Sequence, residues 1–230
     1  IILKRQKEIL DRFNMTKDLK KRTLTSIVLF LLLFFSFINN YILGYVLIIV
    51  GLLSVLEFLK MAEIIFKKTK LIKILINSFF FLYIFYFFTV FFVLSFSLHL
   101  KILIFIILLT CVASDIGGFV FGKTLKGPKL TRISPKKTIA GAIGSLIFSA
   151  AFIPLMIYYF SKNFEPSIII IGVLTSISCQ IGDLFISYLK RKSSLKDTGN
   201  FLPGHGGVLD RIDGMLLGIP LGFLTLLIVY

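Results

Sequence analysis

Apolar residues fall in seven long blocks along this sequence, separated by short polar or basic segments. A helix needs about 20 consecutive apolar residues to cross the ~30 Å hydrocarbon layer of a bilayer. Hydrophobic residues make up 57% of the chain, whereas soluble domains carry roughly 45 to 50%. We therefore predict an all-α, polytopic transmembrane helix bundle. Its expected spans are about 24–39, 41–59, 74–98, 102–121, 139–160, 167–187 and 209–230.

Basic residues predict how these spans are oriented. The formal net charge is +15, and most Lys and Arg residues lie in four segments: eight before the first span, five in 60–73, six in 122–137 and four in 188–207. The alternate connections carry no basic residue or a single lysine. Because cytoplasmic loops are rich in Lys and Arg, the N-terminus is predicted to be cytoplasmic. Topology thus explains the charge, and no nucleic-acid partner is expected.

The block at 74–98 leaves one alternative open. It is long for a single span, so it would tilt, or it could be a re-entrant pair that gives eight segments. A pair would invert every later loop and separate the basic segments onto two sides. The charge count therefore favours seven spans.

Composition divides the chain into a basic cytoplasmic N-terminal segment (1–23), N-terminal transmembrane helices (24–110) and a C-terminal transmembrane region with cytoplasmic loops (111–230). The charged start lacks the pattern of a cleavable signal, so the first helix is expected to remain as an anchor. The segment MTKDLKKRTLTS, which begins at Met15, is a plausible start of the protein, so we expect residues 1–14 to be an upstream extension. Cys111 and Cys179 lie in apolar blocks without metal-ligand spacing and are expected to be small packing residues.

Five acidic residues lie within or at the ends of apolar blocks, where each costs roughly 2.5 to 3.5 kcal/mol to insert. Asp210 and Asp213 are three apart on one helical face, so both carboxylates can approach one cation. Alternatively, they favour the positive end of a helix dipole, with Arg211 as partner. Asp183 could instead be an interhelical hydrogen-bonding residue, and the glycines after Asp115 could simply allow close helix packing. The five acids are Glu57, Asp115, Asp183, Asp210 and Asp213.

The surrounding loops are suited to a phosphate-bearing substrate. The basic segments 122–137 and 188–207 are predicted on the same side as the acids, as a polyphosphate would require. His205 lies between Gly204 and Gly206, in a loop that could expose backbone N–H groups to phosphate. We expect His205 to contact phosphate or to act in acid–base chemistry, although a lone histidine is usually a surface or structural residue.

One long segment resembles a known family. Residues 187–213 read SYLKRKSSLKDTGNFLPGHGGVLDRID, which resembles the signature of phosphatidate cytidylyltransferases: a serine, then Lys-Arg, Lys-Asp, an apolar-Pro pair, His-Gly-Gly and Asp-Arg-x-Asp. ASDIGGFVFGK, ISPKKTIAG and QIGDLFIS resemble further family segments, so residues 111–214 carry the resemblance. The first 110 residues agree only in hydropathy and in RTLTSIVLF. Ala140 and Ile186 depart from the family pattern, which often has glutamates there.

The resemblance implies a multi-pass enzyme of a bacterial inner membrane whose active site faces the cytoplasm. It would transfer the cytidylyl group of CTP to phosphatidic acid, giving CDP-diacylglycerol and pyrophosphate in phospholipid biosynthesis. Its partners would be CTP, phosphatidic acid and the bilayer, and a homodimer is left open. Mg²⁺ is the implied cofactor, with a second cation such as K⁺ as an option; the implied metal ligands are Asp183, Asp210 and Asp213. The implied catalytic residues are Asp183, Lys196, His205, Asp210 and Asp213. The implied substrate-binding residues are Lys136, Lys137, Lys190, Arg191, Asp197 and Arg211.

Other functions remain as alternatives. Membrane acids also mark ion paths, so a cation-coupled transporter is one, although the sequence shows no inverted repeat and no carboxylate near a midplane. A CTP-dependent polyprenol or phytol kinase is a nearer one, and the complete run from Lys-Asp to Asp-Arg-x-Asp favours the cytidylyltransferase over it. CDP-alcohol phosphotransferases fit less well, because Gly214 is not followed by their Ala-Arg.

Overall fold

The computed structural model describes residues 2–162, 164–204 and 206–229, with side chains from residue 19 onward. All regular elements in these ranges are helices, and pairing of extended backbone is limited to two isolated bridges. Seven segments of the described chain are long and apolar enough to cross a membrane, which confirms the predicted bundle. The helices are α1 (Ile2–Ile38), α2 (Asn40–Ile65), α3 (Lys70–Leu94), α4 (Leu98–Thr124), α5 (Ile139–Ser161), α6 (Ile168–Lys192), α7 (Leu209–Ile212) and α8 (Met215–Val229).

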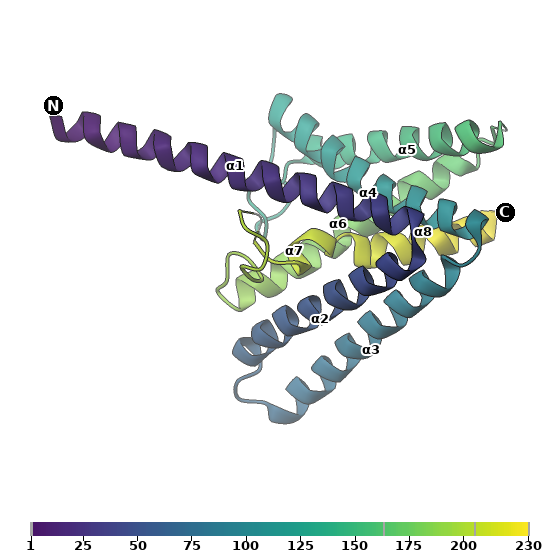
Figure 1. Cartoon of the computed structure of the whole chain (residues 1–230), viewed down its shortest axis with the longest axis horizontal. Coiled ribbons are helices and arrows are strands. Elements are labelled where there is room, and N and C mark those ends of the chain that lie inside the picture. Colours follow the sequence, from purple (N-terminus) through teal and green to yellow (C-terminus); the bar gives the residue numbers. More distant parts are fainter. Residues whose placement is uncertain (1, 163, 205, 230) are drawn as a thin grey trace.

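The ends of these helices sort by charge (Figure 1). The basic connections that follow α2, α4 and α6 gather at one end of the bundle, on the left of the view. The connections that follow α1, α3 and α5 lie toward the other end, together with the C-terminus. This alternation is the one predicted for single spans. The block at 74–98 contributes a single helix, α3, which ends at Leu94, rather than a re-entrant pair, and Leu98 already begins α4.

α1 includes both the basic segment predicted at 1–23 and the first span. It is one continuous helix of 37 residues, and its N-terminal part projects beyond the other helices (Figure 1). The sequence explains this continuity, because residues 2–38 contain no Gly or Pro and are rich in Leu, Lys and Arg, which favour helix.

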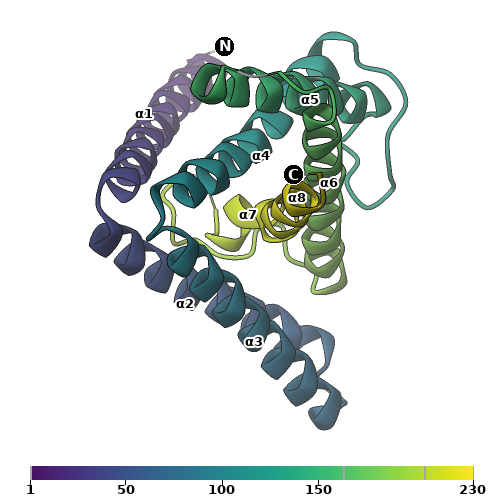
Figure 2. The same cartoon turned by 90° about the vertical axis from the view of Figure 1, so that its right-hand side faces the viewer.

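The helices form two groups (Figure 2). α4, α5, α6 and α8 pack together, with α4 and α6 each contacting both α5 and α8. α2 and α3 form a hairpin that extends from one side of this group. The rings of Phe58 and Phe80 are stacked with centroids 3.8 Å apart and hold the two hairpin helices together. The main apolar core joins the hairpin to α4, α6 and α8.

Small residues allow α4 and α5 to approach closely. A side chain added at Gly141 would lie 2.8 Å from the carbonyl oxygen of Gly118, and one added at Gly118 would lie 2.6 Å from Ser145 Oγ. Glycine and serine at these positions permit close backbone contact, as in other membrane helix pairs. The glycines after Asp115 therefore do serve helix packing, as one interpretation of the sequence proposed.

The last predicted span is interrupted near its start. The helix expected from residue 209 divides into α7 and α8 at a turn formed by Asp213 and Gly214. The backbone N–H of Gly214 donates to the side chain of Asp213, at 2.8 Å from Oδ1. This turn brings Asp213 against α6.

Candidate functional site

A polar pocket lies at the basic end of the bundle. It has a volume of 290 Å³ and is lined by α4, α5, α6 and the loop at 125–138. Asp115 reaches it from α4, Lys136 and Lys137 from the loop, and Gln180 and Asp183 from α6. Residues far apart in the sequence thus meet there, and cations and carboxylates face the same space. The pocket is a candidate site for an anionic substrate.

Lys137 and Asp183 form an ion pair in this pocket. Both side chains are partly exposed, at 27% and 29%. Ser187, one turn further along α6, donates its hydroxyl to Asp183 Oδ1 at 3.2 Å. The loop position of Lys137 is fixed nearby, because Thr138 caps α5 by accepting the N–H of Gly141 at 3.1 Å. The carboxylate of Asp183 therefore has a defined direction toward the pocket.

Asp213 lies beside Asp183, across the contact between α6 and the turn that follows α7. Gly182 makes this contact possible, because a side chain there would lie 2.5 Å from the carbonyl oxygen of Asp213 and 3.3 Å from Gly214 Cα. Asp213 interacts electrostatically with Asp183 and with Asp115. The same end of the bundle therefore holds three carboxylates from three different segments.

Asp210 bonds α6 and the loop that precedes it. Lys190 donates to its Oδ1 at 2.6 Å, and the backbone N–H groups of Thr198 and Gly207 donate to its Oδ2 at 2.8 and 3.1 Å. Both side chains of the pair with Lys190 are largely buried, at 13% and 8% exposed. Both oxygens of Asp210 are therefore engaged. Oδ1 accepts from Lys190 of α6, and Oδ2 accepts from the segment at 193–208, which we call the signature loop.

The predicted metal set is brought together only in part. Asp183 and Asp213 are neighbours, whereas Asp210 is directed toward the signature loop, and Asp115 is the further carboxylate near the pair. In the part of the chain that the structure describes, no group of three or more His, Cys, Asp or Glu side chains could hold a metal ion. The oxygen donors of Asp183 and Asp213 suit a hard divalent cation, but the position of Asp210 does not. The metal site stays a prediction.

The remaining predicted site residues are distributed around the pocket and the signature loop. Arg191 donates from Nε to the carbonyl oxygen of Ile133 at 3.4 Å and so joins the end of α6 to the 125–138 loop. Arg211 interacts electrostatically with Asp115. Lys196 and Asp197 are exposed, and Asp197 lines a second, open cavity away from Asp183. The predicted role of His205 falls outside the described residues.

Two residues gain a role that the sequence had not assigned. Gln180 lines the pocket and donates from Nε2 to the carbonyl oxygen of Ala142 and to Ser176 Oγ, both at 3.3 Å. Glu57 is completely buried on α2 and bonds the signature loop. The position of Glu57 within an apolar block had marked it, but a neutral amide such as Gln180 gives no comparable signal. The departure at Ile186 is buried in the core and does not line the pocket.

These features define a multi-pass membrane protein with a charged pocket at one end of its helices. Residues 6–229 match the cytidylyltransferase family, and the chain belongs to that family. A phosphatidate cytidylyltransferase of Rickettsia bellii (strain RML369-C) is 44% identical over 119 residues, which cover 47% of this chain and 51% of the relative.

Two further relatives carry the same name. That of Rickettsia felis is 43% identical over 130 residues, covering 51% of this chain and 56% of the relative. That of Helicobacter pylori (strain J99) is 43% identical over 113 residues, covering 49% of this chain and 42% of the relative. The chain thus spans about half the length of the curated relatives it matches.

Proposed function

We propose that this protein is a phosphatidate cytidylyltransferase that makes CDP-diacylglycerol from CTP and phosphatidic acid. Family membership supports cytidylyl transfer, and the relatives described above suggest the lipid acceptor. The observation that carries the proposal is the pocket in which Lys137 meets Asp183, at the end of the helices where the basic loops gather. A water-soluble nucleotide and a lipid headgroup can both reach a site at that depth.

In the proposed reaction, a phosphate oxygen of phosphatidic acid attacks the α-phosphorus of CTP. A new P–O bond forms, the bond from the α-phosphorus to the oxygen that bridges to the β-phosphate breaks, and pyrophosphate leaves with that oxygen. The attacking oxygen is already anionic, so the protein needs no strong general base. Its task is to align two anions and to offset their charge.

The basic side chains would supply most of that charge. Lys136 and Lys137 line the pocket, Arg191 bonds the loop that carries both lysines, and Arg211 interacts with Asp115 of the pocket lining. Lys190 would act mainly through Asp210, with which it is paired. Lys196 and Asp197, exposed on the signature loop, would meet substrate only at its outer edge.

Asp183 and Asp213 would hold Mg²⁺, and a second cation such as K⁺ remains an option for the same end of the bundle. When bound, the divalent cation would neutralise phosphate charge. Serine hydroxyl donation from Ser187 and the close packing of Gly182 keep the two carboxylates in place for this role. We further propose a bacterial inner membrane as the location, with the pocket facing the cytoplasm; basic loops are expected on that side.

The test is an assay of the purified chain in lipid vesicles that contain phosphatidic acid, with radiolabelled CTP and Mg²⁺. We expect label to enter a lipid-soluble product, with one pyrophosphate released for each cytidylyl group transferred. Replacing phosphatidic acid by polyprenol or diacylglycerol should give no labelled lipid. Label transferred from the γ-phosphate of CTP, without cytidine, would instead identify a kinase and overturn the proposal.

A further inference from the structure

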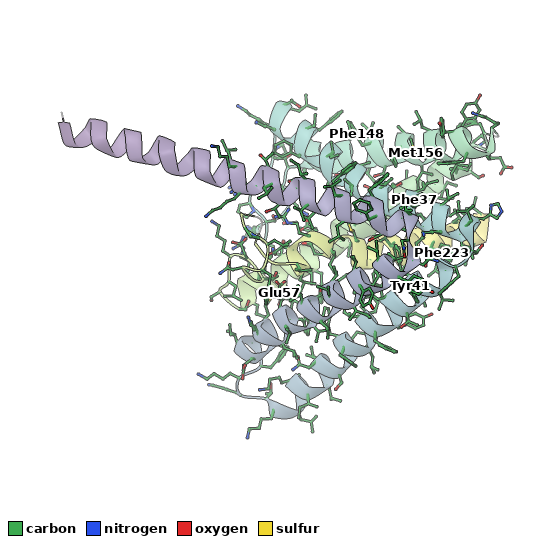
Figure 3. All side chains as sticks on the ribbon, in the orientation of Figure 1. Phe37, Tyr41, Glu57, Phe148, Met156 and Phe223 are labelled. Carbon is green, nitrogen blue, oxygen red and sulfur yellow. The ribbon has the colours of Figure 1, made fainter. Side chains whose placement is uncertain are left out.

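We propose that Glu57 of α2 is a positioning residue that holds the signature loop, and through it Asp213, in place. This inference concerns how the proposed function is organised and rests on it. Glu57 is 0% exposed, and Figure 3 shows it where α2 meets the signature loop. Within the described residues, the ion pairs do not include Glu57. A buried carboxylate without a cation must be stabilised by hydrogen bonds.

Three donors from the other half of the chain provide those bonds. The hydroxyl of Thr198 donates to Glu57 Oε2 at 2.7 Å, and the backbone N–H of Leu209 donates to the same oxygen at 2.8 Å. The backbone N–H of Val208 donates to Oε1 at 2.9 Å. The first amides of a helix have no partner within it, and Glu57 accepts those at the start of α7. It thus caps α7 from a helix about 150 residues away in the sequence.

The glycines of the signature loop fit around this carboxylate. A side chain at Gly207 would lie 2.6 Å from Glu57 Oε2, and one at Gly199 would lie 2.9 Å from Glu57 Cδ. These two glycines are therefore required for close approach to Glu57, which gives a physical reason for their place in the Lys-Asp to Asp-Arg-x-Asp segment.

Glu57 and Asp210 hold the same loop from two sides. Thr198 donates its hydroxyl to Glu57 and its backbone N–H to Asp210, at 2.7 and 2.8 Å. The loop leads directly into α7, and the turn after α7 places Asp213 against Gly182. Glu57 does not line the pocket itself. Its influence on the site therefore runs through the loop and α7, which is why we describe it as positioning rather than catalytic.

Glu57→Gln tests the proposal, because the amide keeps the size but turns one acceptor into a donor that opposes a backbone N–H. Thr198→Val removes a single bond and provides a milder variant in case Glu57→Gln does not fold. Thr198→Ser keeps the hydroxyl. Glu63→Gln is the matched control, since Glu63 lies on the same helix with its side chain 75% exposed.

The first readout is hydrogen exchange of the amides at 198–209, measured by mass spectrometry on the full chain in detergent. Because hydrogen bonds to charged groups are the stronger kind, we expect exchange to be about 10-fold or more faster in Glu57→Gln, and faster in Thr198→Val than in Thr198→Ser. Glu63→Gln should match the parent. Parental exchange in Glu57→Gln and Thr198→Val would overturn the proposal, whatever their activity.

The second readout is cytidylyl transfer. A misplaced Asp213 should lower kcat by about 10-fold or more while KM for CTP changes much less, and Thr198→Ser should recover the activity that Thr198→Val loses. If these variants lose turnover while the amides at 198–209 exchange as slowly as in the parent, the positioning role is contradicted. If the parent itself transfers no cytidylyl group, the proposed function fails, and the exchange data still decide whether Glu57 holds the loop.

Discussion

Lys137 and Asp183 join the 125–138 loop to α6 by a direct ion pair. They are far apart in the sequence, and each belongs to a segment that resembles a different motif of the family. Both residues line the pocket, so a cation and a carboxylate lie where substrate phosphate is expected. Several measurable consequences follow from this arrangement and its neighbours.

Lys137→Met should lower kcat/KM for CTP by about 100-fold, because a preorganised charge near the α-phosphate of CTP is lost. The assay is cytidylyl transfer in vesicles. Lys129→Met is the control, since Lys129 is exposed in the same loop and does not line the pocket. Equal losses in the two variants would mean that loop charge in general, rather than this pair, matters.

Asp213→Asn and Asp210→Asn should fail in different ways. Asp213→Asn should abolish transfer while the protein stays folded. Asp210→Asn leaves Lys190 buried without its charge partner, which should cost about 3–5 kcal/mol of stability. Thermal unfolding can be followed with a thiol-reactive dye, because Cys111 and Cys179 are free and buried. The double variant with Lys190→Met should regain much of the stability; a stable Asp210→Asn protein would contradict the prediction.

Gly182→Ala should displace the turn that carries Asp213, since the added methyl group would lie 2.5 Å from a backbone carbonyl oxygen. Overpacking of this kind costs about 1–3 kcal/mol, so the protein should fold, with a lower unfolding temperature and much reduced transfer. Ile181→Ala, a neighbour with a 53% exposed side chain, is the control. Parental activity in Gly182→Ala would show that this contact does not position Asp213.

Removal of divalent cations by a chelator should stop cytidylyl transfer, and added Mg²⁺ should restore it. Mg²⁺ should also raise the unfolding temperature of the substrate-free protein, because a ligand that binds only the folded state stabilises it. We expect Asp183→Asn and Asp213→Asn to lose this rise. If Asp210→Asn loses it as well, at a temperature where it remains folded, then Asp210 turns toward the metal when Mg²⁺ binds.

The sequence predicted the bundle well because each span is a long apolar block, and block length and loop charge need no knowledge of packing. It could not predict the partners of Asp210, because the spacing of two acids along a helix does not show which donors from other segments will reach each carboxylate. Lys190 and the signature loop occupy both oxygens of Asp210, whereas Oδ1 of Asp213 accepts the N–H of Gly214.

The pocket lining was predicted in part for a similar reason. Charged residues within or beside the apolar blocks are easy to recognise in the sequence. Three of them do share one pocket: Lys136, Lys137 and Asp183. Gln180 and the partners of Glu57 depend on which helices meet, which local pattern does not specify. The continuous course of α1 through residue 23 shows the converse: helix propensity, rather than hydropathy, lets that helix run through the charged residues that precede the span.

The bonds from Glu57 to the backbone of Val208 and Leu209 bear on how this protein can be divided. The four segments that carry most of the family resemblance lie after residue 110, so a shortened chain that starts there would still contain all of them. Without Glu57, however, the N–H groups of Val208 and Leu209 at the start of α7 would lose their acceptor, and Gly199 and Gly207 would lose the side chain that packs against them. The N-terminal apolar helices are thus needed to hold the signature loop and α7, and a chain truncated at residue 110 would need them supplied as a separate fragment.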